Sequence, residues 1–262
     1  MQPEQICLGN GSDETIDLVY RCFCRPGKDN VVAIDPTYGM YKVCADINDV
    51  EYRSVPLNTQ FDIQAEAMLD AADANTKVMW ICSPNNPSGN DLNEQQIRII
   101  LDLFDGIVVI DEAYSDFTHR RAFRYELNKY PNLIVLNTMS KAWALAGIRL
   151  GMAFASKDII EVFNKVKYPY NINLLTQQKA MDALNHTLEV SKWVSTIILE
   201  RSRLMDAFTQ LPSCVKVYPS NANFFLTEMT NANDIYNYLV NRGIIVRNRS
   251  RVSMCNNCLR IT

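Results

Sequence analysis

The sequence predicts an α/β protein: a three-layer large domain with a mostly parallel seven-stranded sheet, followed by a smaller α+β domain. Three observations carry this prediction. Seven short apolar segments alternate with amphipathic stretches up to residue 155. Several of these segments are apolar throughout, which is typical of strands covered on both faces and hence of parallel sheets. After Lys157 the pattern becomes mainly helical.

The first part of the chain supplies the strands of the predicted large sheet. They span residues 5–8, 31–34, 51–55, 77–82, 107–110, 133–136 and 152–155. Between the first two segments, Ile16, Val19, Tyr20 and Phe23 recur at helical spacing, and residues 93–105 repeat that pattern. We assign residues 1–190 to the large domain.

The remainder is predicted to form a partial C-terminal small domain over residues 191–262. Helical patterns dominate residues 157–210, with a break at Pro169. Beyond Pro212 we expect one helix over 232–242, which Gly243 ends, and strands over 215–218, 223–227, 244–247 and 259–262.

The composition excludes several classes of function. The 262 residues are 48% hydrophobic, and 26 basic against 29 acidic side chains give a net charge of −3. That balance argues against binding nucleic acid through a basic face. The apolar runs are too short to cross a bilayer, and no secretory signal is visible.

The cysteines and histidines do not make a metal site. Cys255 and Cys258 have the spacing of half a zinc site, but the chain has only two histidines and no second pair of this kind. We therefore predict no metal. Eight cysteines are most simply explained as free thiols in a reducing cytoplasm.

Polar residues follow several apolar segments, at the positions where ligands bind in open α/β sheets. A glycine turn leads to Ser12 and Asp13, which open a helix whose free N–H groups attract anions. Tyr38 follows the second segment, and Asn86 lies in a proline-rich loop after the fourth. Taken singly, each has an ordinary explanation as a capped turn, a packed tyrosine or a rigid connector.

Charged residues follow two further segments. Asp111 ends a wholly apolar run, where a carboxylate is costly to bury unless it meets a cation or a strong donor. A metal site for nucleotide hydrolysis would need a GxxxxGK[ST] loop, which is missing. Lys141, preceded by Ser140 and followed by Arg149, is a candidate for covalent chemistry, although most lysines are surface residues.

Together these residues meet the requirements of one cofactor, pyridoxal 5'-phosphate. The amine of Lys141 can react with an aldehyde, and the carboxylate of Asp111 can pair with a ring cation. Tyr38 offers an aromatic face for a planar ring. The helix start, Ser140 and Arg149 suit a phosphate.

The motifs also resemble a known family. GNGSDETIDL, PTYGMY, SPNNPSG, IDEAYSDF, TMSKAWALAGIRLG, GIIVR and CLRIT occur in family order across nearly the whole chain. They resemble the fold-type I pyridoxal-phosphate aminotransferases of the aspartate aminotransferase superfamily, and within it the histidinol-phosphate aminotransferases. The resemblance implies amino transfer between L-histidinol phosphate and 2-oxoglutarate in histidine biosynthesis.

Carried over by motif position, the resemblance implies roles around the cofactor ring. Lys141 would bond covalently to the cofactor, and Asp111 would pair with the ring nitrogen. Tyr114 and Asn86 would hydrogen-bond the ring's 3-oxygen, and Tyr38 would stack on the ring. Lys141, Asp111 and Tyr114 are thus the expected catalytic residues.

The resemblance also implies how anions are held. The cofactor phosphate would be bound by Ser12, Asp13, Ser140 and Arg149. Arg260 would bind the distal acid group of the substrate, and Arg247 would bind substrate phosphate.

Further expectations concern assembly and alternatives. Family members are homodimers that begin before Gln5 and continue past Thr262, so this chain is expected to be truncated at both ends. A threonine-phosphate decarboxylase and an aromatic amino acid aminotransferase remain alternative enzymes. A non-catalytic sensing domain of a transcription regulator is the alternative outside enzymes.

Overall fold

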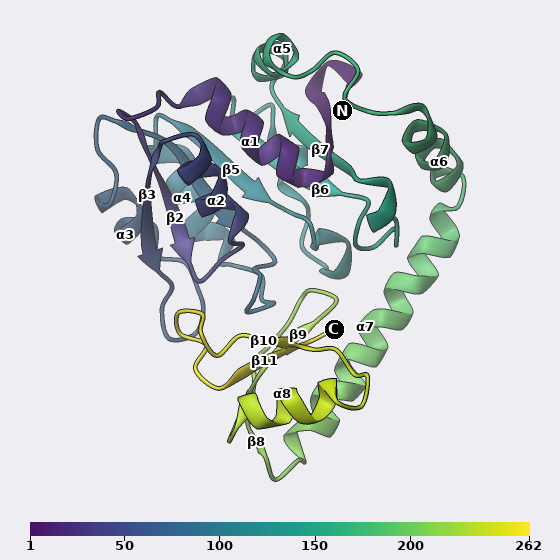
Figure 1. Cartoon of the computed structure of the whole chain (residues 1–262). Helices are drawn as coiled ribbons and strands as arrows, with labels where there is room; N and C mark the ends of the chain where they lie inside the picture. Colours follow the sequence, from purple (N-terminus) through teal and green to yellow (C-terminus); the bar gives the residue numbers. More distant parts are fainter.

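The computed structural model describes residues 1–262, which form two sheets with their helices (Figure 1). The larger sheet has seven strands in the order β1-β7-β6-β5-β4-β2-β3. Its strands are β1 (Ile6–Asn10), β2 (Asn30–Asp35), β3 (Glu51–Pro56), β4 (Thr76–Cys82), β5 (Ile107–Asp111), β6 (Leu133–Thr138) and β7 (Leu150–Ala155). All seven predicted strands are therefore present, with ends shifted by at most two residues.

The strand directions confirm the mostly parallel sheet. The neighbours from β3 to β6 pair in parallel, whereas β7 is antiparallel to both β1 and β6. Every strand except β7 thus points the same way. Their C-terminal ends meet at one edge of the sheet, which is where open α/β sheets bind ligands.

Helices cover both faces of this sheet and give the predicted three layers. One buried cluster contains side chains from α1 (Gly11–Phe23), α2 (Met40–Ile47) and α5 (Lys157–Val166), and the opposite cluster contains side chains from α3 (Ala65–Asp70) and α4 (Glu94–Leu103). Strand β2 contributes Val31 and Ala33 to the first cluster and Val32 and Ile34 to the second. Its side chains alternate between two apolar layers, which is why its sequence is apolar throughout.

The smaller sheet is antiparallel, in the order β10-β11-β9-β8. Its elements are β8 (Cys214–Val217), β9 (Phe225–Met229), α8 (Ala232–Val240), β10 (Arg247–Asn248) and β11 (Cys258–Ile261). The predicted strand over 244–247 is wrong for most of its length. Of the predicted segment, Arg247 alone is paired with β11, while Ile244 and Ile245 are exposed and lie outside the ladder.

Two helices connect the sheets. The chain passes from α6 (Leu174–Leu184) into α7 (Thr187–Thr209), which runs alongside the molecule to β8 (Figure 1). The predicted boundary between residues 190 and 191 lies inside α7, and the division into two domains stays a prediction. None of the helices is both long and apolar enough to cross a membrane.

Candidate active site

A cavity of about 290 Å³ lies between the C-terminal edge of the large sheet and the small sheet. The residues predicted from sequence all line it: Ser12, Asp13, Tyr38, Asn86, Asp111, Tyr114, Ser140, Lys141, Arg149, Arg247 and Arg260. They come from both sheets and from almost the full length of the chain, so the fold itself assembles this group. Their individual roles stay predictions.

Asp111, the last residue of β5, is 3% exposed. The Tyr41 hydroxyl donates to its Oδ2 at 2.7 Å, and the Ala113 amide donates to its Oδ1 at 3.0 Å. Burial raises the pKa of this carboxyl, although the two hydrogen bonds and the charge of Lys141 oppose the shift. The site therefore holds a fixed acid that lacks a directly paired cation.

Lys141 lies beyond the end of β6, with its Nζ 5.3 Å from the centroid of the Tyr114 ring. Burial, and next the positive charge of Arg260, lower the pKa of the lysine, while Asp111 opposes them. A lowered pKa increases the neutral fraction of the amine, which is the form that reacts with an aldehyde. Burial raises the pKa of Tyr114 to about 12, so its hydroxyl remains a donor.

The start of α1 is packed unusually tightly. A Cβ on Gly11 would lie 2.5 Å from Arg149 Nη2, and one on Gly151 would lie 2.3 Å from the carbonyl carbon of Gly11. Gly11 and Arg149 both have left-handed backbones, with φ of 71° and 53°. Arg149 contacts Asp13 at 3.3 Å, and Asp13 also accepts from the Tyr38 hydroxyl at 2.9 Å.

The opposite wall belongs to the small sheet. Arg260 Nη1 donates to Asn86 Oδ1 at 2.8 Å, and the guanidinium carbon lies 4.6 Å from the centroid of the Phe224 ring. Because Asn86 uses its oxygen for Arg260, its amide nitrogen is left as a donor. Arg247 lies directly opposite Arg260 in the β10–β11 ladder.

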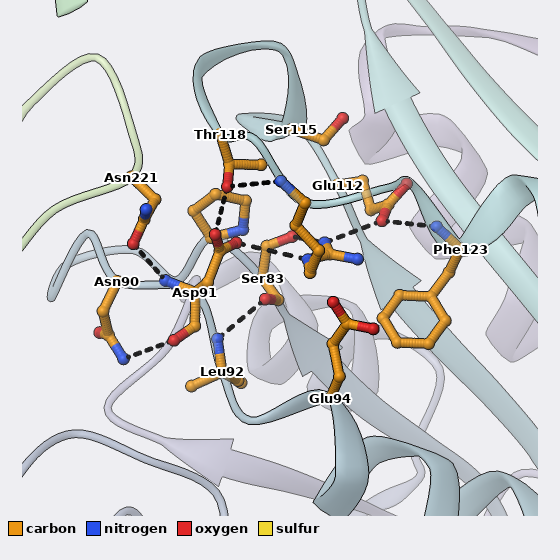
Figure 2. Close-up of polar contacts among 12 residues, drawn as sticks. Ser83, Asn90, Asp91, Leu92, Glu94, Glu112, Ser115, Thr118, Phe123 and Asn221 are labelled. Atoms are coloured by element: carbon orange, nitrogen blue, oxygen red, sulfur yellow. Dashed lines mark hydrogen bonds and ion pairs between the residues drawn. The ribbon is translucent and has the colours of Figure 1, made fainter.

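An ion-pair network joins the segment after β5, which begins at Glu112, to the loop after β4, which begins at Ser83 (Figure 2). Arg120, whose side chain is 5% exposed, donates to Glu112 Oε1 at 2.9 Å and to the Ser83 carbonyl at 3.2 Å. Asp91, paired with Arg120, accepts a hydrogen bond from the Thr118 hydroxyl. The Asp91 amide donates to Asn221 Oδ1 at 3.0 Å, which joins the network to the segment before β9.

The cavity fits pyridoxal phosphate. A cationic ring nitrogen would give the buried Asp111 carboxylate the partner it lacks, and Lys141 opens onto the same cavity. Ser12 and Asp13 at the start of α1 line the cavity beside Ser140 and Arg149. This arrangement suits a phosphate, because the first N–H groups of a helix lack partners within the helix.

Sequence reasoning missed some contributors. Arg249 lines the cavity, and its position two residues after Arg247 is the signal that could have identified it, because alternate strand residues share a face. Tyr41 had no such signal, since its contact with Asp111 depends on how α2 docks on the sheet.

Comparison with known proteins agrees with this geometry. The sequence profile of the family "Aminotransferase class I and II" matches residues 1–262. The chain is 59% identical over 260 residues to the histidinol-phosphate aminotransferase of Bacteroides fragilis (strain YCH46), covering 99% of this chain and 75% of that protein.

Solved structures share the fold. The histidinol-phosphate aminotransferase from Clostridium acetobutylicum superposes with a TM-score of 0.91 at 26% identity, covering 98% of this chain and 78% of that one. The Sinorhizobium meliloti enzyme of that name, solved with pyridoxal-5'-phosphate, gives 0.89 at 22% identity, covering 100% of this chain and 73% of that one. This chain belongs to the class I and II aminotransferases and is a pyridoxal-phosphate-dependent enzyme.

Proposed function

We propose that the chain transfers the amino group between L-histidinol phosphate and 2-oxoglutarate, giving imidazole acetol phosphate and glutamate, in histidine biosynthesis. One observation carries the choice of substrate. Arg247 and Arg260 face each other across the β10–β11 ladder, and neither forms an ion pair with a carboxylate. Paired guanidinium groups suit a phosphate on the substrate. The identity to relatives named histidinol-phosphate aminotransferase supports this choice.

When bound, pyridoxal phosphate supplies an aldehyde that condenses with amines and a ring that withdraws electrons from the substrate. Asp111 would keep a proton on the ring nitrogen, because a nearby negative charge favours the protonated form. The Tyr114 hydroxyl and the Asn86 amide would donate to the ring's 3-oxygen. Tyr38 would cover one face of the ring.

Lys141 has two tasks in this proposal. Its neutral amine would bond to the cofactor before substrate arrives. Once released, its Nζ would accept the proton from the substrate α-carbon as a general base, which a lowered lysine pKa favours near neutral pH.

The cofactor phosphate would lie at the start of α1. The backbone N–H groups of Ser12 and Asp13, the Ser140 hydroxyl and the Arg149 guanidinium would bind its oxygens. Arg149 would then exchange part of its contact with Asp13 for the phosphate dianion.

We further propose a homodimer and a cytoplasmic location. Large apolar side chains are exposed along α6, α7 and the segment before them: Tyr170, Leu174, Leu175, Met181 and Leu188. Such a surface is typical of one that another protein covers, and a second copy is the proposed occupant. The eight free cysteines support a reducing compartment.

Steady-state kinetics test the proposed substrate. The enzyme is assayed with L-histidinol phosphate, L-phenylalanine and O-phospho-L-threonine, with 2-oxoglutarate as acceptor. We expect the highest kcat/KM with L-histidinol phosphate. A clear preference for L-phenylalanine, or release of carbon dioxide from O-phospho-L-threonine, would reject the proposal in favour of an aromatic aminotransferase or a decarboxylase.

A further inference from the structure

The small-sheet wall of the cavity carries a third arginine, Arg249, beside Arg247 and Arg260. Strand β10 ends at Asn248, but the ladder continues, since the Arg249 amide donates to the Cys258 carbonyl at 2.8 Å. Residues two apart on a strand project to the same face, and so do residues directly opposite on paired strands. The register therefore places all three guanidinium groups on the cavity side.

The intervening residues confirm this assignment of faces. Leu259, which pairs with Asn248, is 1% exposed and packs in the core of the small domain. One face of the ribbon therefore turns Leu259 toward the core, and the other face turns the three arginines toward the cavity.

The charges on the cationic face are uncompensated. None of the three arginines forms an ion pair, and the Nε atoms of Arg249 and Arg260 are buried without a hydrogen-bond partner. Burial, and next the charge of Arg247, lower the pKa of Arg249. Like charges directly opposite on a ladder are destabilising, so this arrangement needs an anion to balance it.

We propose that Arg249 binds the phosphate of the substrate and determines the preference for a phosphate dianion over a carboxylate at this subsite. The inference rests on the proposed function. A phosphate monoester carries close to two negative charges at pH 7 and has three acceptor oxygens. The distal carboxylate of glutamate carries one charge and is satisfied by one bidentate arginine. Arg249 therefore contributes to binding one of the enzyme's two amino donors and not the other.

The test compares Arg249→Gln with Arg251→Gln in the cofactor-loaded enzyme. Arg251 lies in the same hairpin, is exposed and does not line the cavity, which makes it a matched control. We expect Arg249→Gln to raise KM for L-histidinol phosphate at least about tenfold, the loss expected for one charged hydrogen bond. KM for L-glutamate should change less than about threefold, and Arg251→Gln should leave both values unchanged.

Two further measurements exclude a general structural defect. Arg249→Lys should recover part of the phosphate preference, because it keeps the charge without the planar fork. Calorimetry in a Lys141→Ala background, which cannot complete the reaction, should show the same weakening in the Kd of L-histidinol phosphate. Equal increases in KM for both amino donors, or no change for either, would overturn the role of Arg249.

An incorrect choice of substrate can be told apart from an incorrect role of Arg249. A wild-type enzyme that does not convert L-histidinol phosphate contradicts the proposed function before any variant is made. The role of Arg249 is then tested with inorganic phosphate as an inhibitor that competes with L-glutamate. Arg249→Gln should raise that inhibition constant at least about tenfold, and an unchanged constant overturns the inference.

Discussion

Arg260 Nη1 donates a hydrogen bond to Asn86 Oδ1 at 2.8 Å, which joins the small sheet to a loop at the edge of the large one. These residues are 174 positions apart in the chain. The contact orients the Asn86 amide and fixes the Arg260 guanidinium over Phe224 at the same time. The geometry of the proposed ring-binding residues and that of the proposed substrate arginines are thus coupled.

Replacing Asp111 with Asn should lower activity and change how the stability of the cofactor-free protein depends on pH. A carboxylate beside the ring nitrogen raises the pKa of that nitrogen by about one to three units, so its loss should reduce kcat/KM about 10- to 1000-fold. Burial raises the pKa of Asp111 in the folded state. The stability that the protonated carboxyl contributes is therefore lost as the pH rises through that raised pKa.

The stability of Asp111→Asn relative to the wild type should therefore increase with pH above the ordinary carboxyl range. The gain is about 1.4 kcal/mol for each unit by which burial raises the pKa. Urea unfolding of both cofactor-free proteins between pH 4 and about pH 8 measures it. A constant difference across this range would contradict the assigned shift.

Removing the charge of Arg120 should destabilise the fold strongly. Arg120→Met leaves the fully buried Glu112 without its cation, and breaking a buried pair costs about 3–5 kcal/mol. Arg203→Met breaks an exposed pair with Glu200 and should change the stability far less, because solvent screens that pair. Adding Glu112→Gln to Arg120→Met should recover part of the loss, and the absence of any recovery would show that the two side chains are not coupled.

A methyl group at Gly151 should disrupt the start of α1. The Cβ of Gly151→Ala would lie 2.3 Å from backbone atoms of Gly11 and Ser12, and such overpacking costs about 1–3 kcal/mol. Affinity for pyridoxal phosphate, measured by fluorescence titration, should fall with the stability. Gly147→Ala is the control, since a Cβ there meets nothing within 4 Å. Equal cofactor affinity in both variants would refute the proposed phosphate position.

The sequence predicted the large sheet well because burial on both faces leaves a strong apolar signal. Strand β4 has Val78 and Trp80 in one cluster and Met79 and Ile81 in the other, and such a segment is apolar without interruption. The small sheet was predicted less accurately. Its pairing at Arg247 depends on register with β11, which a short segment such as 244–247 does not specify.

Site residues at strand ends could be located because strand ends converge in an open sheet. Residues that act from outside the motifs could not be located from the sequence. The contact between Tyr41 and Asp111 depends on helix docking, and the pairing of Arg120 with Glu112 depends on the path of the loop after β5.

In the proposed mechanism, the amine of Lys141 is the group that bonds covalently to the cofactor. Borohydride reduction of the enzyme loaded with pyridoxal phosphate, followed by proteolysis and mass spectrometry, identifies the lysine that forms this bond. We expect one modified peptide, with the pyridoxyl phosphate on Lys141, and no specific modification in Lys141→Ala. Specific labelling of another lysine, or a specifically labelled Lys141→Ala variant, would refute this role of Lys141.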